Sequence, residues 1–76
     1  MTENAVLEFK TAPVVDQIQA VARVLRKMSN KDIADYINSK TGRNLGPADW
    51  SNIVAGRTKG PAAEEAIRIM RELTGV

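Results

Sequence analysis

The sequence predicts an all-α, four-helix domain, and three observations support this prediction. Signals that start helices recur along the chain: Ser29–Asp32 reads as a capping box, and the string Gly-Pro-Ala occurs at Gly46 and again at Gly60. Apolar residues follow these starts at intervals of three and four, the spacing of an amphipathic helix. Only Ala5–Phe9 alternates as a strand does, so residues 1–10 are either a short strand or an arm. A length of 76 residues gives one domain, 1–76.

The first two helices are predicted from one apolar stripe and one capping box. The first helix is expected to begin near Thr11–Pro13, with Thr11 as its N-cap. Its apolar stripe consists of Val14, Ile18, Val21, Leu25 and Met28. The second helix begins at the capping box and ends by Gly42. Its inner face consists of Ile33, Ala34 and Ile37, with Tyr36 beside them.

The two Gly-Pro-Ala strings predict the starts of two further helices, because glycine suits the N-cap and proline suits the first helical position. The third helix spans 47–56, with Asp49 at its positive end and Gly56 as its stop. Its buried residues are Trp50, Ile53 and Val54. The fourth helix spans Ala62–Leu73 and ends at Gly75, with Val76 folding back on it. Its inner face consists of Ala63, Ala66, Ile67, Met70 and Leu73.

The composition argues against catalysis and against metal or cofactor chemistry. The chain has no Cys and no His, so it lacks the usual ligands for zinc, iron–sulfur clusters and haem. The string Gly-Arg-Thr-Lys-Gly at 56–60 lacks the spacing and the strand-to-helix context of a phosphate-binding loop. The paired acids Glu64–Glu65 and Asp32–Asp35 lie at predicted helix starts, where they serve as capping and dipole residues. We therefore expect neither an enzyme nor a cofactor.

The chain is expected to be cytoplasmic and to form a homodimer. No apolar run approaches the roughly 20 residues that a membrane span needs, so no membrane association is expected. The segment Met1–Lys10 carries acids where a signal peptide needs positive charge. A domain this small buries only a modest core, so a second copy is an expected source of stability. The expected dimer surface is Ala5–Phe9 or the last helix.

One short helix bracketed by basic residues is the strongest indication of function. The net charge is only +2, but residues 40–60 contain four basic residues and a single acidic residue, Asp49. Short outward side chains would let helix 47–56 approach the major groove of DNA, where serine and asparagine can hydrogen-bond base edges. Basic side chains before and after the helix would bind DNA phosphates. The predicted DNA-binding residues are Lys40, Arg43, Asn44, Ala48, Ser51, Asn52, Ala55, Arg57, Thr58 and Lys59.

The same stretch resembles the lambda-repressor-like and Cro-like phage regulators. Lys31–Ile37, with the small Ala34, looks like the first helix of a helix-turn-helix, and Trp50–Ile53 followed by Gly56-Arg57 looks like its recognition helix and basic corner. The resemblance covers Ser29–Leu73 and implies a transcriptional regulator that binds a palindromic double-stranded DNA operator as a homodimer. The chain departs from the pattern by some six extra residues, around 39–44, which extend the first helix or the turn.

A different class of function uses the same scaffold without DNA. The mild net charge, the extended turn and Asp49 at the start of the third helix also suit a small phage-type protein-interaction module. Such a module would act as an inhibitor or antirepressor by binding a host or repressor protein.

Overall fold

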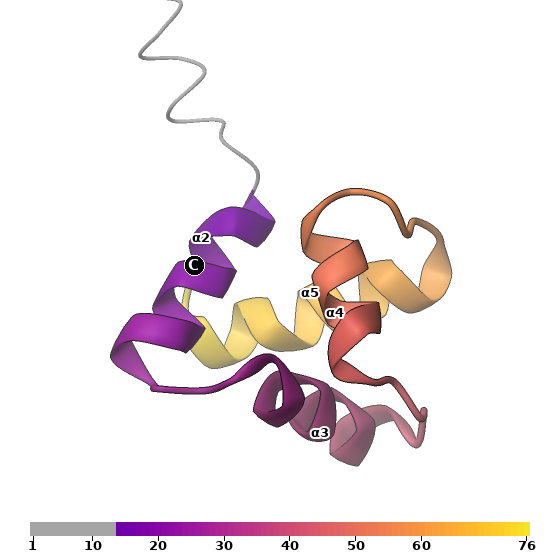
Figure 1. The fold of residues 1–76 in the computed structure, drawn as a ribbon, viewed down its shortest axis with the longest axis horizontal. Coiled ribbons are helices and arrows are strands. Elements are labelled where there is room, and N and C mark those ends of the chain that lie inside the picture. Colours follow the sequence, from indigo (N-terminus) through magenta and orange to yellow (C-terminus); the bar gives the residue numbers. More distant parts are fainter. Residues whose placement is uncertain (1–13) are drawn as a thin grey trace, which may run out of the picture.

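Four helical regions make up residues 14–76, the part of the chain that the computed structural model describes (Figure 1). Helix α2 (Val14–Ala20) continues directly into the π-helical segment η1 (Val21–Leu25), and α3 (Asn30–Thr41), α4 (Pro47–Val54) and α5 (Pro61–Thr74) follow. No strand occurs among these residues. The predicted all-α, four-helix fold is therefore confirmed. The predictions for Ala5–Phe9 and for Thr11 concern residues outside the described part.

The core forms where the helices meet around a single tryptophan. Trp50 is fully buried, as its spacing to Ile53 predicted. Helix α5 lies behind α4 in Figure 1 and packs against α2 and α3. Each helix contributes small or aliphatic side chains to this core: Ile18, Ala22, Ile33, Ala34, Ile37, Ile53, Ala63, Ala66, Ile69 and Met70. Over residues 14–76, none of the helices combines the length and the apolar character needed to cross a membrane.

The predicted stripe of the first helix is wrong at its C-terminal end. Leu25 is 74% exposed, whereas Ala22, which lies outside the stripe, is fully buried. The cause is the π-helical geometry of η1, where Arg26 N donates to Val21 O at 3.1 Å. A bond to the fifth preceding residue widens the turn, so each side chain advances by a smaller angle than in an α-helix. The apolar stripe consequently leaves the core before it reaches Leu25.

The prediction for the last helix is correct in part. Ala63, Ala66 and Met70 are buried as expected, but Ile69 is buried as well, and Ile67 is only half-buried. Because α5 packs against both α2 and α3, its buried face is wider than one stripe. At its end, Gly75 adopts a left-handed conformation and Val76 packs against the core, as predicted.

Helix α3 begins and ends as the sequence predicted. Ser29 Oγ accepts a hydrogen bond from Asp32 N at 3.1 Å, and Asp32 Oδ2 accepts one from Ser29 N at 2.9 Å. These hydrogen bonds to Ser29 lower the pKa of the Asp32 carboxyl because they stabilise its charged form. Gly42, with φ of 76°, ends the helix. Both helix ends are formed by residues next to them in the sequence and need no contact with the rest of the fold.

Candidate nucleic-acid interface

The outer face of α4 carries short side chains, because its larger residues are turned inward. Trp50 and Ile53 anchor the helix in the core. On the other side, Ala48 and Ala55 are exposed, while Ser51 and Asn52 are half-buried. The regular helix ends at Val54, two residues before the predicted 47–56 limit. The predicted short-residue surface is therefore present, although the last exposed alanine lies just beyond the helix.

The start of α4 is occupied by one of its own acids. Gly46 is the N-cap with extended backbone, and Pro47 follows at the first helical position. Asp49 Oδ2 accepts a hydrogen bond from Gly46 N at 2.7 Å. The carboxylate thus lies at the positive end of the helix dipole, where it stabilises α4 and opposes a phosphate at the same place.

A two-way hydrogen bond fixes the connection between α3 and α4. Asn38 Nδ2 donates to Leu45 O at 2.9 Å, and Leu45 N donates to Asn38 Oδ1 at 2.8 Å. Residues 39–41 continue α3, and 42–46 form the connection to α4. The Asn38 side chain therefore sets where α4 begins relative to α3.

Three of the predicted DNA-binding residues come together where the chain leaves α4. Gly56 has a φ of 80°, and this left-handed turn brings the next residues back towards the helix. Arg57 N and Thr58 N both donate to Asn52 O, at 2.9 and 3.2 Å. The Arg57 side chain returns as well, since its Nε donates to Asn52 Oδ1 at 3.0 Å. Asn52, Arg57 and Thr58 thus form one cluster, called here the exit cluster.

The other predicted DNA-binding residues contact other parts of the molecule or lie apart from α4. Arg43 Nε pairs with Glu65 Oε1 of α5 at 2.8 Å, so its charge is already partnered. Lys40 Nζ lies over the Tyr36 ring, 5.5 Å from the ring centroid. Asn44 is exposed, and Lys59 lines a hollow together with Thr58 of the exit cluster. The structure therefore does not gather the ten predicted residues into one continuous patch.

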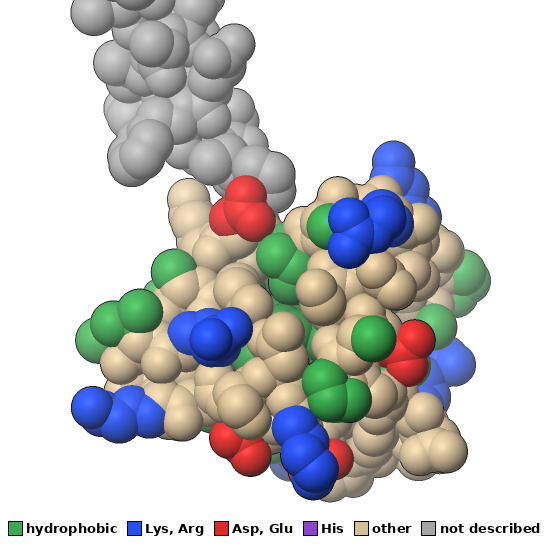
Figure 2. Space-filling model, viewed as in Figure 1, with side chains coloured by type: hydrophobic (Ala, Val, Ile, Leu, Met, Phe, Trp, Pro, Cys, Tyr) green, Lys and Arg blue, Asp and Glu red, His purple; other side chains and the backbone are tan. Residues whose placement is uncertain are grey.

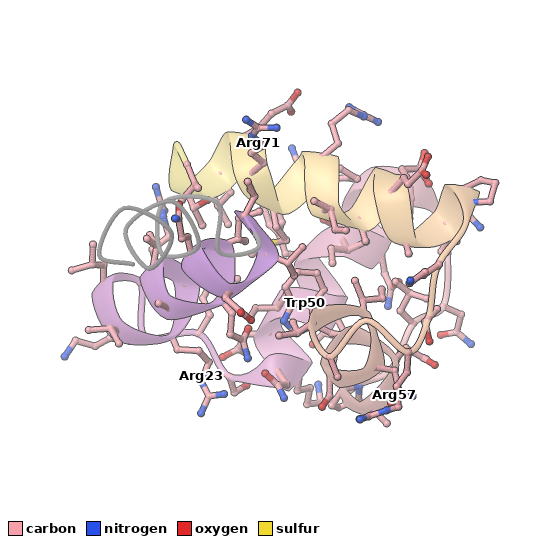
Figure 3. The ribbon with its side chains drawn as sticks, turned by 90° about the horizontal axis from the view of Figure 1, so that it is seen from above. Arg23, Trp50, Arg57 and Arg71 are labelled. Atoms are coloured by element: carbon pink, nitrogen blue, oxygen red, sulfur yellow. The ribbon has the colours of Figure 1, made fainter. Side chains whose placement is uncertain are left out.

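A polar chain that the sequence did not predict links the core to the surface beside α4. The Trp50 indole Nε1 donates to Gln19 Oε1 at 2.7 Å, and Gln19 Nε2 donates to Asn30 Oδ1 at 3.2 Å. Arg23 Nη1 reaches the same Asn30 oxygen at 3.4 Å. Figure 3 shows Arg23 and Arg57 on the side of the molecule away from Arg71, so Arg23 shares a face with the exit cluster. The one available signal was that a buried indole N–H requires an acceptor.

Charge on this face is dispersed. Figure 2 shows its Lys and Arg side chains as separate groups around a largely uncharged centre. Near the start of α3, Lys31 Nζ and Asp35 Oδ2 form an exposed pair at 2.9 Å. The hydrogen bond and the charge of Asp35 raise the pKa of the Lys31 ammonium. Within residues 14–76, no three acidic side chains gather as a metal site would require.

A hollow of about 270 Å³ opens between the N-terminal half of α2, the exit of α4 and the first turns of α5. Its apolar lining comes from Val15, Ile53, Ala63 and Ile67, and its polar lining includes Lys59. A hollow lined mainly by aliphatic groups suits an apolar side chain better than a charged ligand.

The groups on the outer face of α4 can hold a ligand by hydrogen bonding at short range. The Arg57 guanidinium and the Asn52 amide supply N–H donors, and the Ser51 hydroxyl can donate or accept. The neighbouring alanines leave room for a flat or grooved surface to approach the backbone. Comparisons with family models, with curated proteins and with solved structures find no match for this chain.

Proposed function

We propose that the protein is a sequence-specific, double-stranded DNA-binding transcriptional regulator of the phage repressor or Cro type. The observation that carries the proposal is the outer face of α4, where short side chains lie next to the exit cluster. A helix enters the major groove only if its outward side chains let the backbone come close, and Ala48, Ser51 and Ala55 meet that condition. In the complex, α4 would lie in the major groove, and the surrounding basic side chains would contact the DNA phosphates.

A two-fold operator follows if the protein acts as a homodimer. Each copy presents one α4, so two copies related by a two-fold axis would bind half-sites about one helical turn apart. Arg23 is added to the candidate phosphate-binding residues because it lies on the same side as Arg57 (Figure 3).

A selection from random duplex DNA followed by a salt titration tests this proposal. Wild-type protein should enrich a palindromic sequence, and its affinity should fall by about 0.9 log units per log unit of salt for each neutralised phosphate. Arg57→Ala should weaken binding about tenfold, consistent with loss of one arginine contact. Arg71→Ala is the matched control, because it removes the same charge from the opposite side and should change affinity less than twofold. If the wild type enriches no sequence and binds no duplex at moderate salt, the proposal is wrong.

The aliphatic hollow favours one second candidate, a phage-type interaction module that binds a host or repressor protein. A partner's apolar side chain could insert between Val15 and Ile67. The test is a pull-down from nuclease-treated host lysate with wild type and with Ile67→Arg. A stoichiometric partner that is lost from the variant, together with no affinity for duplex DNA, would support this candidate over a regulator.

A further inference from the structure

The exit cluster holds the Arg57 guanidinium against the outer face of α4. Arg57 follows the helix by three residues, yet its Nε returns to Asn52 Oδ1 at 3.0 Å. Two backbone hydrogen bonds to Asn52 O fix the turn that makes this return possible. A long, exposed side chain is thereby held in one direction, and no acidic side chain of residues 14–76 pairs with it. Its guanidinium therefore lies beside the Asn52 side chain of α4.

This hydrogen bond also determines how the Asn52 amide is oriented. A guanidinium has only donors, so the atom that faces Arg57 Nε must be the amide oxygen and not the nitrogen. Within residues 14–76, Nε is the Arg57 side-chain atom that forms a hydrogen bond, so Nη1 and Nη2 remain available as donors. The Asn52 Nδ2 group adds two more N–H donors. The pair therefore presents mainly donors to a ligand, since Arg57 already engages one lone pair of its amide oxygen.

We infer that the Asn52–Arg57 pair reads a guanine in the major groove, an inference that rests on the proposed DNA-binding function. Guanine is the base that presents two acceptors there, N7 and O6, and they match the paired Nη groups of arginine. Asparagine reads adenine by turning its oxygen to the adenine N6 amino group and its nitrogen to N7. Because Asn52 Oδ1 is turned to Arg57 Nε instead, Asn52 is a positioning residue, and Arg57 is the residue that contacts the base.

Base analogues at a single position test which atoms are read. The position is the one where selection with Arg57→Ala loses its base preference. There, replacing guanine by 7-deazaguanine removes N7 alone, and wild-type affinity should fall about tenfold, as it should for an A·T pair. Inosine is the matched control, because it keeps N7 and O6 and loses only the minor-groove amino group. Inosine should bind within twofold of guanine.

Variants of both residues separate positioning from charge. Arg57→Lys keeps the charge but loses Nε and the planar fork, so the guanine preference should weaken while the salt dependence stays unchanged. Asn52→Leu should lose the preference, because nothing then holds the guanidinium. Asn52→Asp keeps an acceptor for Nε, so the preference should persist even as overall affinity falls through charge repulsion. A merely structural role for Asn52 would not give this difference between leucine and aspartate. Circular dichroism melting confirms that each variant is folded.

Three results would overturn the inference while the proposed function stands. One is an enriched adenine at the Arg57-dependent position. Another is undiminished binding to 7-deazaguanine. The third is a uniform loss of affinity for Arg57→Ala on every base, with a salt dependence reduced by one phosphate, since that pattern identifies a phosphate contact. Failure of the proposed function has a different signature, namely a wild-type protein that enriches no duplex sequence.

Discussion

Lys27 carries backbone strain at the end of the first helical region. Its φ is 56°, in the left-handed region that costs a residue with a Cβ about 1–2 kcal/mol. The conformation persists because Met28 N, at the next residue, reaches back to Ala22 O at 2.9 Å and closes the helix end.

Lys27→Gly should therefore stabilise the fold. The relief of strain outweighs the extra entropy that glycine gives to the unfolded chain, so we expect a gain of about 0.5 kcal/mol and a rise in Tm of some 2–4 °C. Thermal unfolding followed by circular dichroism measures this. Lys27→Ala is the control, because alanine removes the charge and keeps the Cβ. An equal rise in Tm for the alanine variant would show that charge, and not backbone strain, limits stability here.

Gln19 satisfies the buried Trp50 indole, so its removal should destabilise the core. Gln19→Leu keeps a similar volume but leaves the indole N–H without its acceptor, which should lower the free energy of unfolding by about 1–3 kcal/mol. Gln19→Glu retains an oxygen for the indole and should cost less. Urea unfolding of the three proteins compares these values. Equal losses for the two variants would mean that the bond to Asn30, and not the bond to Trp50, is the important one.

At the residue scale, the sequence indicated which side chains are buried more reliably than which pairs meet. Trp50 was assigned to the core from its spacing to Ile53, a local pattern, and it is fully buried. Its hydrogen bond to Gln19 joins residues 31 positions apart, and no local pattern reports such a contact. The bond between Asn52 and Arg57 is short in sequence but depends on the left-handed turn at Gly56.

The capping box of α3 makes stability depend on pH through Asp32. Its pKa is lowered in the folded state, so its contribution is present above the unfolded pKa of about 4 and is lost as pH falls through the folded pKa. Asp32→Asn does not titrate. The Tm of wild type should exceed that of the variant near pH 7, and the difference should shrink as pH falls below about 4. Thermal melts across this range measure it. A gap that stays constant with pH would contradict a charged cap.

Helix ends were predictable because their signals are local, whereas helix interiors were predictable only where the helix is regular. Ser29, Gly42 and Gly75 each act on the turn beside them, and all three serve as the sequence indicated. Leu25 was misplaced because the π-helical η1 changes the angle between successive side chains. Ile69 was missed because the packing of α5 against two partners is a tertiary feature.

A dimer would explain the most exposed aliphatic side chains of the described chain. Val24 and Leu25 are 70% and 74% exposed and adjacent, whereas the outer side of α5 carries the exposed pair Arg68–Glu72. Burying such aliphatic side chains in an interface would contribute roughly 1.5–3 kcal/mol of free energy per side chain. We therefore expect them at the centre of a homodimer interface.

Sedimentation equilibrium tests this expectation. Wild type should be dimeric at micromolar concentration, and the double variant Val24→Glu, Leu25→Glu should be monomeric with a nearly unchanged fold. Gln17→Glu, an exposed change on α2, is the control and should remain dimeric. A monomeric wild type, or a double variant that still dimerises, would place the interface elsewhere or exclude it.

At the scale of the whole molecule, the class of fold followed from helix signals and apolar spacing, but the layout of the candidate site did not. The sequence places Lys40 and Arg43 just before α4, yet Arg43 pairs with Glu65 across the fold. Conversely, Arg23 lies far from α4 in the chain and shares a face with Arg57 (Figure 3). Both outcomes depend on how helices cross, and linear charge patterns do not encode that.

The two-way bond between Asn38 and Leu45 has a consequence for the thermodynamics of any binding by α4. Ordering a loose connection costs about 1–2 kcal/mol per residue in backbone entropy. Without the hydrogen bonds between Asn38 and Leu45, ordering residues 42–46 would reduce the free energy of ligand binding by this cost. Here that cost is met during folding, so α4 is preorganised and keeps its direction in the unliganded protein. A ligand of α4 would then dock on a rigid helix, and its selectivity would come from the contacts and not from a disorder-to-order transition.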